Sequence, residues 1–503
     1  MAQSDTPPPG PDLTQGVPLS SVPEAGMLAG HVDGAAVLLA RIDGSVHAVA
    51  GTCTHYGAPL AEGLLRDGEI HCPWHHACFS LRTGAALGAP AFAPLATFDV
   101  DIVGDTVFVR GEARETTPAP MQVRAPPDRI VIIGGGAAGF AAATRLRELG
   151  FSGAVSMLSA DSASPCDRPN LSKDYLAGTA PEDWIPLQGP DFYAGHEIEL
   201  RLDCDVVSID ARAQRVVTAS GDAVPYDALL LATGAEPRRL PTPGFDRPNV
   251  FVLRSLADAR AIIAACANAR RVALIGAGFI GMEAAAALRT RGLEVNVVAQ
   301  DRVPLERVLG PDLGAFVTRL HRAHGVEFHL QRHATGFDGA VLVLDDGSRV
   351  PADFVIVGAG VVPRTALAGA TGMQVQDGIL VDEYLETSIP RHFAAGDVAR
   401  YRRGGESIRI EHWVHAQRQG QAAAANLLGA RQPFTDVPFF WTHHYGLDLR
   451  YTGHAKDWDE IRFEGDPDRH DCMARFFRNG ILVAAASVGR DIENLEVEAA
   501  LHP

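Results

Sequence analysis

The stretch RIVIIGGGAAGFAAATRLRELG, residues 129–150, runs from an apolar segment through a glycine-rich turn into an alanine-rich segment. Its glycines Gly134, Gly136 and Gly139 have the G-x-G-x-x-G spacing that joins a strand to a helix in dinucleotide-binding folds. The first glycine allows a tight turn, the second lets the backbone approach a pyrophosphate, and the third lets the helix pack closely on the strand. We therefore expect a parallel α/β domain with an anion site at a helix N-terminus.

The same pattern recurs as RVALIGAGFIGMEAAAALRTRG at residues 271–292, with Gly276, Gly278 and Gly281 in the equivalent places. One such match is weak evidence, because glycine-rich turns are common. Two copies, each placed between an apolar run and an alanine-rich run, predict two dinucleotide-binding units in one chain.

The composition restricts the class of protein. A chain of 503 residues is too long for one hydrophobic core and predicts several domains. The net charge of -17 makes a nucleic-acid backbone an unfavourable partner, so we expect no nucleic-acid binding. No apolar run reaches the ~18 residues of a membrane span, and residues 1–20 lack the features of a signal peptide. Together with the scattered cysteines, this favours a cytoplasmic protein with a metal site over a secreted disulfide scaffold.

Two short segments near the start of the chain each place a cysteine close to a histidine. CTHYG contains Cys53 and His55, and CPWHHACF contains Cys72 and His75. Such ligands suit a tetrahedral zinc site. They also suit a Rieske [2Fe–2S] centre, in which two cysteines bind one iron and two histidines bind the other. Two loops that each supply one ligand of each kind favour the Rieske centre, with zinc and ordinary core residues as the alternatives.

The residues around the four ligand candidates also carry information. CTHYGAPL and CPWHHACF resemble the two cluster-binding loops of the Rieske family, over about the first 95 residues. High-potential members carry two further cysteines, where this chain has Ala58 and Trp74. They also carry a serine and a tyrosine that donate hydrogen bonds to sulfur, where this chain has Ala77 and Phe79. Loss of those hydrogen-bond donors predicts a cluster whose reduction potential lies near the low end of the Rieske range, about -150 mV. His76 stands where the family usually has glycine. It could crowd the loop or be a surface histidine, and we favour the surface histidine.

The segment after the first glycine motif carries further candidate residues. Asp161 follows Gly139 at the distance where an acid binds ribose hydroxyls, although it also suits a helix cap or a loop. PCDRPNLSKDYL then supplies Arg168 and Lys173. Lys173 is one of only two lysines in a chain rich in arginine, which indicates a specific need for it.

Three later segments have the character of flavin contacts. YDALLLATGAEPR, residues 226–238, contains Thr233 and Gly234. FAAGDVARY, residues 393–401, contains Gly396 and Asp397, and an acid in that place can bind a ribityl chain. EHWVHAQRQG begins a predicted helix at His412 and Trp413, whose first N–H groups can hold a flavin pyrimidine ring.

In the order of these motifs, residues 129–503 resemble the ferredoxin-reductase and apoptosis-inducing-factor branch of the two-nucleotide flavoprotein family. The full chain resembles its Rieske-fused members. The resemblance implies FAD between the first nucleotide domain and the Asp397 segment, and NAD(P)H on the second glycine motif. It also implies that Glu283 and Lys173 meet beside the flavin, where an ammonium group stabilises the negative charge that hydride transfer delivers.

Two differences between this chain and related families bear on the coenzyme and on the electron route. Members that prefer NADH carry an acid at the end of the second strand of the NAD unit, where this chain has Ala299, and Arg302 could meet a 2′-phosphate instead. NADH and NADPH therefore both stay open. Disulfide reductases of this superfamily need a C-x-x-C or C-x4-C pair beside the flavin, and Cys166 stands alone there. Dithiol relay is excluded, so single electrons must pass to an iron–sulfur centre.

We therefore expect a reductase that passes electrons from NAD(P)H through FAD to its own Rieske cluster, and on to an acceptor protein such as an oxygenase or a carrier. The alternative is an NADH-binding redox-sensing or interaction flavoprotein with little turnover. The predicted fold is an all-β Rieske domain, two Rossmann-like α/β domains and a C-terminal α+β domain. The boundaries are a disordered tail (1–16), the Rieske domain (17–110), a linker (111–128), the FAD domain (129–245 and 371–435), the NAD(P) domain (246–370) and the C-terminal domain (436–503).

Overall fold

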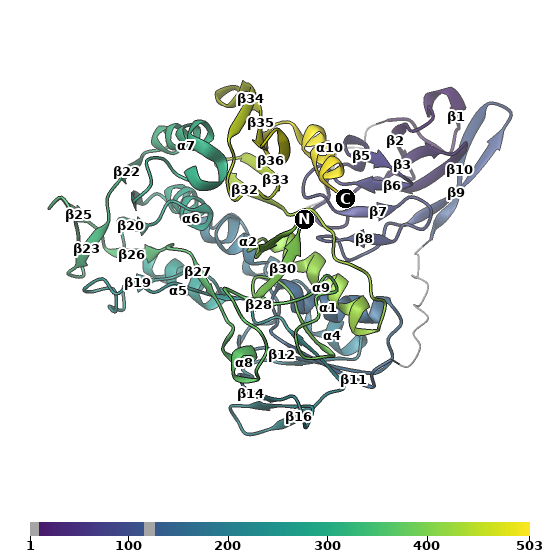
Figure 1. Ribbon diagram of the computed structural model, residues 1–503. Coiled ribbons are helices and arrows are strands. Elements are labelled where there is room, and N and C mark those ends of the chain that lie inside the picture. Colours follow the sequence, from purple (N-terminus) through teal and green to yellow (C-terminus); the bar gives the residue numbers. More distant parts are fainter. Residues whose placement is uncertain (1–9, 115–125, 503) are drawn as a thin grey trace. The chain divides into compact units, whose positions relative to one another are not determined.

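The computed structural model describes residues 10–114 and 126–502 (Figure 1). The chain divides into two compact units. One contains the N-terminal β region together with residues 144–152 and the residues from 490 onward. The other contains residues 125–143 and 153–489. The architecture confirms the predicted fold class in each of its parts.

The N-terminal region consists of two antiparallel sheets. The larger has the order β1-β10-β9-β4-β3-β2, and the smaller the order β5-β6-β7-β8. Asp43 and Gly44 both have positive φ in the tight turn that joins β3 and β4 into a hairpin. The strands are β1 (Val17–Pro18), β2 (Met27–Val32), β3 (Ala35–Ile42), β4 (Ser45–Ala50), β5 (Leu64–Arg66), β6 (Glu69–His71), β7 (Cys78–Ser80), β8 (Ala86–Gly88), β9 (Thr97–Val103) and β10 (Thr106–Arg114).

Two boundaries of this region differ from prediction. The tail was predicted to be disordered through residue 16, but Leu13 is fully buried and Asp12 pairs with His31. An apolar side chain in the core holds this part of the chain, so the prediction is wrong for residues 10–16; residues 1–9 lie outside the described part. The linker was predicted from residue 111, but β10 continues to Arg114. Residues 115–125 lie outside the described part.

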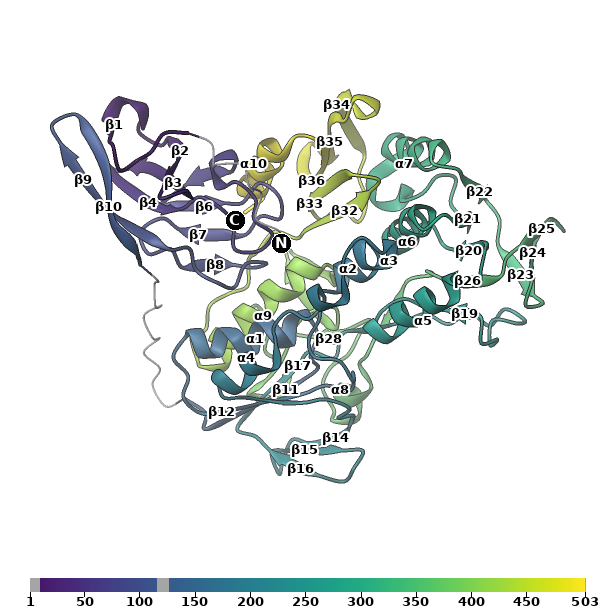
Figure 2. The ribbon, with the colours of Figure 1, turned by 180° about the vertical axis from the view of Figure 1, so that it is seen from behind.

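The first nucleotide domain is built on a parallel sheet of order β13-β12-β11-β17-β29. Alternate residues Val131 and Ile133 of β11 pack against the three-stranded meander β14-β15-β16. The helices seen around this sheet in Figure 2 include α1 and α9. Its strands and helices are β11 (Arg129–Ile133), α1 (Ala137–Glu148), β12 (Ala154–Leu158), α2 (Arg168–Leu171), α3 (Asp174–Ala177), α4 (Pro190–Gly195), β13 (Ile198–Arg201), β14 (Val206–Asp210), β15 (Arg215–Thr218), β16 (Ala223–Pro225), β17 (Ala228–Leu231), α8 (Ala366–Ala370), β28 (Ile379–Leu380), β29 (His392–Ala394), β30 (Ala399–Arg403), β31 (Glu406–Ile408) and α9 (Trp413–Leu427).

The second nucleotide domain repeats this plan with the parallel order β19-β26-β20-β21-β22. One face of the sheet packs against α6 and α7, and the other against the meander β23-β24-β25. The antiparallel pair β18 (Ala235–Pro237) and β27 (Val361–Pro363) connects the two nucleotide domains. The remaining elements are β19 (Val250–Phe251), α5 (Leu256–Cys266), β20 (Arg271–Ile275), α6 (Phe279–Thr290), β21 (Glu294–Ala299), α7 (Glu306–Ala323), β22 (Val326–Leu330), β23 (Ala334–Phe337), β24 (Val341–Leu344), β25 (Arg349–Pro351) and β26 (Phe354–Val357).

The C-terminal region supplies a five-stranded antiparallel sheet of order β32-β33-β36-β35-β34. Its buried residues Phe440, Tyr451 and Phe476 join the core formed by α6 and α7. This sheet therefore packs on the second nucleotide domain within one compact unit. Its strands are β32 (Phe439–His444), β33 (Leu447–Gly453), β34 (Glu460–Asp466), β35 (Asp471–Arg478) and β36 (Ile481–Val488). The last helix, α10 (Asp491–Leu501), belongs to the compact unit that contains the N-terminal region.

Candidate functional site

The two glycine motifs have the same geometry. Gly134 and Gly276 have φ values of 113° and 105°, in the region that favours glycine. A Cβ on Gly139 would lie 1.9 Å from the carbonyl oxygen of Gly134, and a Cβ on Gly281 would lie 2.3 Å from that of Gly276. Only glycine allows this approach of helix to turn. Each turn thus leads directly into a helix N-terminus, a place that suits an anion.

One cleft of about 1130 Å³ connects the two nucleotide motifs. Most of the predicted site residues of this unit line it, although they come from segments far apart in the sequence. Gly139 and Gly276 lie behind its wall, where they shape the turns. The predicted residues that line the cleft are Gly134, Gly136, Asp161, Arg168, Lys173, Thr233, Gly234, Gly278, Gly281, Glu283, Gly396, Asp397, His412 and Trp413.

Lys173 and Glu283 form an ion pair in the wall of this cleft. Their Nζ and Oε1 atoms are 3.0 Å apart, and only 10% and 3% of the two side chains are exposed. Ser172 donates a hydrogen bond to Oε2 of Glu283, and Thr442 donates one to Oε1 over 2.7 Å. A buried charge pair requires such additional hydrogen bonds to offset its desolvation. The carboxylate is fixed by three side chains and holds the ammonium group at the cleft.

Several residues of this cleft were not among those predicted from the sequence. Trp441 of β32 lies with its ring 5.7 Å from Nζ of Lys173, and Thr442 follows it. Residues 436–503 contain no motif that would have identified either one. Arg254, which forms a 2.6 Å ion pair with Asp397, also lies outside every motif. The contacts of Lys173 and Asp397 depend on the folded chain, so a linear pattern does not reveal them.

The acidic candidates differ in their surroundings. Asp161 is half-buried just after the end of β12, and its Oδ2 accepts a 3.0 Å hydrogen bond from Arg168. Asp397 is buried and faces Arg254. Burial raises the pKa of the nearby Glu411 carboxyl. Each of the two aspartates is thus paired with an arginine in the lining of the cleft.

The start of α9 forms another wall of the cleft. His412 caps this helix, and Trp413 is its first residue. Oε1 of Gln419, further along the helix, accepts a 2.7 Å hydrogen bond from the backbone N–H of Gly396. A Cβ on Gly420 would lie 2.2 Å from the carbonyl oxygen of Ala138, so α9 packs closely on the start of α1. These contacts fix the helix N-terminus beside the FAAGD turn.

A row of hydrogen bonds continues from Glu283 into the C-terminal sheet. Oγ1 of Thr442 lies 3.1 Å from Nε2 of His444, and Nδ1 of His444 lies 3.3 Å from Nε2 of His321. Both histidines are fully buried. Burial lowers the pKa of His444 to about 3 and that of His321 well below its ordinary value. Both rings are therefore neutral at pH 7 and hold Thr442 in place against the carboxylate.

The buried His444 predicts a loss of stability in mild acid. An unfolded imidazole titrates near pH 6.5, whereas folded His444 titrates near pH 3. Between these two pH values the unfolded chain binds one more proton than the folded chain. The contribution of His444 to the free energy of unfolding is therefore complete above pH 6.5 and is lost as the pH falls. We expect His444→Gln to reduce the pH slope of the free energy of unfolding by about 1 kcal/mol per pH unit. Urea unfolding at pH 7.0 and 5.5 measures the slope.

His329→Gln on β22 is the matched control, because it removes a histidine that lies only partly buried beside Asn296. The His329→Gln variant should keep most of the pH slope of the free energy of unfolding. Equal pH slopes in the wild type and His444→Gln would contradict the expected role of burial.

The four cysteine and histidine ligand candidates converge between the two N-terminal loops. The Nδ1 atoms of His55 and His75 lie 3.2 Å apart, and the thiol of Cys53 is hydrogen-bonded to that of Cys72. This hydrogen bond, followed by burial, raises the pKa of the Cys53 thiol. Burial lowers the pKa of His55 to about 4, which leaves a neutral imidazole at pH 7. Two sulfurs together and two Nδ1 atoms together form the donor set that a [2Fe–2S] cluster of this type uses.

The two loops have matching backbones, which explains the position of His76. The Cys53 N–H donates to the Ala58 carbonyl, and the Cys72 N–H donates to the Ala77 carbonyl. Gly57 and His76 occupy equivalent places, with φ values of 78° and 58°. His76 was predicted to lie on the surface, but it is fully buried and its Nδ1 contacts Oε2 of Glu498 on α10. That prediction is wrong, because the carboxylate of Glu498, whose side chain is 15% exposed, is a partner for the buried ring.

The comparison with known proteins assigns the chain to a family. Residues 128–420 match the pyridine nucleotide-disulphide oxidoreductase family. The chain belongs to this family. Residues 16–99 match the Rieske [2Fe-2S] domain, and residues 439–499 match the C-terminal domain of reductases. The recognised family, the fold class and the cofactors FAD and [2Fe–2S] are thus confirmed.

Individual relatives place the chain more closely within the family. Apoptosis-inducing factor 3 of Homo sapiens is 33% identical over 476 residues, which cover 90% of this chain and 78% of that protein. Rhodocoxin reductase of Rhodococcus erythropolis is 40% identical over 347 residues, 67% of this chain and 81% of the relative. The crystal structure of the covalent putidaredoxin reductase–putidaredoxin complex matches with a TM-score of 0.72 and 33% identity, over 75% of this chain and 94% of that chain.

These matches show an NAD(P)H-dependent FAD oxidoreductase of the ferredoxin and rubredoxin reductase type that carries a Rieske domain and transfers electrons. In residues 10–114 and 126–502, every helix is too short or too polar to cross a membrane.

Proposed function

We propose that this oxidoreductase is self-contained: electrons from NAD(P)H pass through FAD to the Rieske cluster of the same chain, and from there to an acceptor protein. One observation carries the proposal. The same chain contains the nucleotide-binding segments of a flavoprotein reductase and the four cysteine and histidine ligand candidates of a Rieske cluster, and its sequence has no C-x-x-C or C-x4-C pair. When bound, FAD accepts a hydride and returns its electrons one at a time, and a [2Fe–2S] cluster carries one electron. Each NAD(P)H thus reduces two one-electron acceptors.

The cleft residues have distinct roles in this proposal. The glycine turns and Arg168 hold phosphate groups, and Asp397 binds hydroxyl groups of the cofactor. Lys173 supplies positive charge where hydride transfer delivers negative charge. Glu283 pairs with this ammonium group over 3.0 Å and offsets the cost of burying its charge. The N-terminus of α9 adds a second positive field at the flavin ring.

The N-terminal loops hold the cluster in the proposal, with Cys53 and Cys72 on one iron and His55 and His75 on the other. Ala77 and Phe79 are both fully buried in the core around the two cysteines. Their apolar side chains support the expectation of a low cluster potential, which suits electrons that come from a flavin.

The proposed electron acceptor is an oxygenase component or another electron carrier. The relatives support this class: one is the ferredoxin reductase subunit of 5,5′-dehydrodivanillate O-demethylase from Sphingobium, and another is the ferredoxin–NAD(+) reductase component of an anthranilate 1,2-dioxygenase system from Burkholderia cepacia. Their matches cover 72% and 73% of this chain. The fused Rieske domain takes the place of a separate carrier.

The deciding experiment is anaerobic stopped-flow mixing of the purified holoprotein with NADH. We expect the flavin to bleach first and the Rieske cluster to be reduced next. The rate of cluster reduction should not depend on protein concentration, because the electron moves within one chain. A rate proportional to protein concentration, or a cluster that stays oxidised, contradicts the proposal.

Steady-state turnover separates this function from a redox sensor. A reductase should reduce many equivalents of ferricyanide or cytochrome c with NADH. A sensor should stop after stoichiometric reduction.

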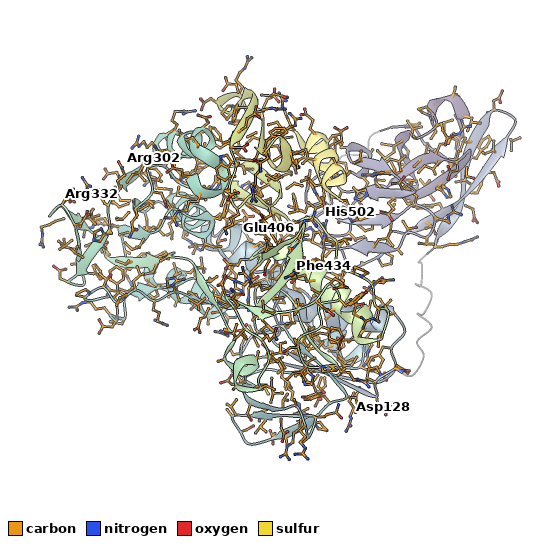
Figure 3. All side chains as sticks on the ribbon, in the orientation of Figure 1. Asp128, Arg302, Arg332, Glu406, Phe434 and His502 are labelled. Atoms are coloured by element: carbon orange, nitrogen blue, oxygen red, sulfur yellow. The ribbon has the colours of Figure 1, made fainter. Side chains whose placement is uncertain are left out.

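We propose NADH as the preferred coenzyme, and two ion pairs on the second nucleotide domain support this choice. Ala299 is the buried last residue of β21, the place where an acid would bind the 2′-hydroxyl. Arg302 and Arg332, both labelled on the second nucleotide domain in Figure 3, would be the cations for a 2′-phosphate. Arg302 donates to Glu306 over 2.9 Å, and Arg332 donates to Asp346 over 2.8 Å. Both guanidinium groups are thus already neutralised.

Removal of Glu306 should therefore improve the use of NADPH. Glu306→Ala leaves Arg302 without this carboxylate, and we expect the ratio of kcat/KM for NADPH to that for NADH to rise about tenfold, the effect of roughly 1.4 kcal/mol. Glu294→Ala, at the opposite end of β21, is the matched control and should leave the ratio unchanged. A ratio that is the same in all three proteins means that Arg302 does not reach the coenzyme.

A further inference from the structure

Three side chains with metal-binding atoms meet in the N-terminal region, outside the four cluster ligand candidates. They are Glu69 and His71 on β6 and Cys78 on β7. The register of the two strands explains their meeting. His71 pairs directly with Cys78 across the antiparallel ladder, and Glu69 lies two residues before His71. Side chains two residues apart on a strand share a face, as do directly paired residues, so all three project from the same side of the sheet.

This face differs from the one that serves the cluster. Cys72 directly follows His71, and neighbouring residues of an extended chain point to opposite sides. Cys72 is 1% exposed and belongs to the core around the cluster loops, whereas the side chain of His71 is 26% exposed. The three side chains therefore form a separate group of donors.

The distances between the donor atoms fit one small ion. Sγ of Cys78 lies 3.0 Å from Oε2 of Glu69 and 3.9 Å from Nε2 of His71, and the latter two atoms lie 3.8 Å apart. The one point in the plane of these three atoms that is equally far from all of them lies about 2.1 Å from each, which matches zinc bonds to nitrogen and oxygen and is about 0.2 Å short of a zinc–sulfur bond. A tetrahedral site places the ion out of this plane, which requires a small rotation of the partly exposed Glu69 and His71 side chains.

The chemistry of the donors selects the ion. A thiolate, an imidazole and a carboxylate are ligands of Zn²⁺, whereas Mg²⁺ and Ca²⁺ take oxygen ligands. The thiolate and the carboxylate carry two negative charges, which a dication neutralises. Cys78 is buried, and the side chain of Glu69 is 42% exposed, so the group opens to solvent on the Glu69 side. A water molecule would complete a tetrahedral site from there.

We propose that Glu69, His71 and Cys78 bind one Zn²⁺ ion that ties β6 to β7. These strands are the two ends of the loop that carries Cys72 and His75, so the ion fixes the base of the second cluster loop. On binding, the S–H bond of Cys78 breaks, a zinc–sulfur bond forms and the proton passes to solvent. This site is independent of the proposed electron route.

The first test measures metal content in the intact holoprotein. After dialysis against micromolar Zn²⁺, we expect one zinc and two irons per chain. Cys78→Ser should lose the zinc and keep both irons, and Glu69→Gln, at a more exposed position, should weaken zinc binding at least tenfold without unfolding risk. Cys204→Ser, a half-buried cysteine outside the N-terminal region, is the matched control and should keep zinc and iron at wild-type levels.

The second test uses Co²⁺ as a spectroscopic probe of the ligands. Titration of the wild type should produce a thiolate-to-cobalt charge-transfer band, which Cys78→Ser should abolish and Cys204→Ser should retain. The proposal is wrong if the wild type binds neither metal at micromolar concentrations, or if the band persists in Cys78→Ser. It is also wrong if zinc enters only as iron is lost, because the metal would then occupy the cluster ligands.

Discussion

Replacement of Lys173 by methionine should slow the reduction of bound flavin by NADH about 10²-fold, a typical loss when one preorganised charge at a reacting centre is removed. The side chain of Lys173 is 90% shielded from water, and its partner Glu283 is more deeply buried. In this setting the positive charge is weakly screened, so its effect on developing negative charge is large. Methionine keeps the length and apolar contacts of the side chain but removes the charge.

The readouts separate a catalytic loss from a structural one. FAD should stay bound, and the Rieske spectrum should be unchanged, because Lys173 lies far along the chain from the cluster loops. Lys456→Met is the natural control, since Lys456 is the other lysine of the chain and is exposed. An unchanged rate of flavin reduction in Lys173→Met would reduce Lys173 to a structural role.

Glu283→Gln tests the partner of this lysine. The glutamine keeps the shape of the side chain and one acceptor oxygen for Ser172 or Thr442, but it cannot balance a positive charge. We expect flavin reduction to slow here too, because the buried ammonium group then lacks the carboxylate that pairs with it and holds it at the cleft. A slow Lys173 variant beside a fully active Glu283 variant would show that the lysine stays charged without its partner.

The fold was predictable from sequence because its signals are local. Each glycine motif lies between a buried strand and a helix, and the backbone at Gly134 and Gly276 admits hardly any other residue. The cysteine and histidine pairs are equally local, since each loop supplies its own two ligand candidates. Such features depend on spacing along the chain, and spacing is what a single sequence displays.

The contacts that complete the cleft were not predictable in this way. Trp441 and Thr442 reach Lys173 and Glu283 only because β32 packs on α6, and Arg254 reaches Asp397 across 143 positions. The environment of His76 also depends on a distant residue, because Glu498 belongs to the last helix. A histidine in a place that favours glycine was a visible anomaly, but its partner was invisible until the chain was folded.

Loss of one cluster ligand should stop electron transfer after the flavin while leaving flavin reduction by NADH intact. In His75→Ala we expect iron and acid-labile sulfide to fall about tenfold or more, because metal sites of this kind depend on their full ligand set. His75 is 7% exposed and lies against His55, so no other side chain can easily replace its Nδ1 atom. His47→Ala, which removes a half-buried histidine from β4 of the same region, is the control and should keep the cluster.

The kinetics of this variant then test the order of the carriers. Hydride transfer occurs in the cleft, so flavin reduction by NADH should proceed at the wild-type rate in His75→Ala. Electron delivery to a one-electron protein acceptor such as cytochrome c should fall at least tenfold, because the cluster is the proposed exit. Ferricyanide is small enough to enter the cleft and should still be reduced. If cytochrome c reduction is equally fast with and without the cluster, electrons leave directly from the flavin and the Rieske domain is not on the route.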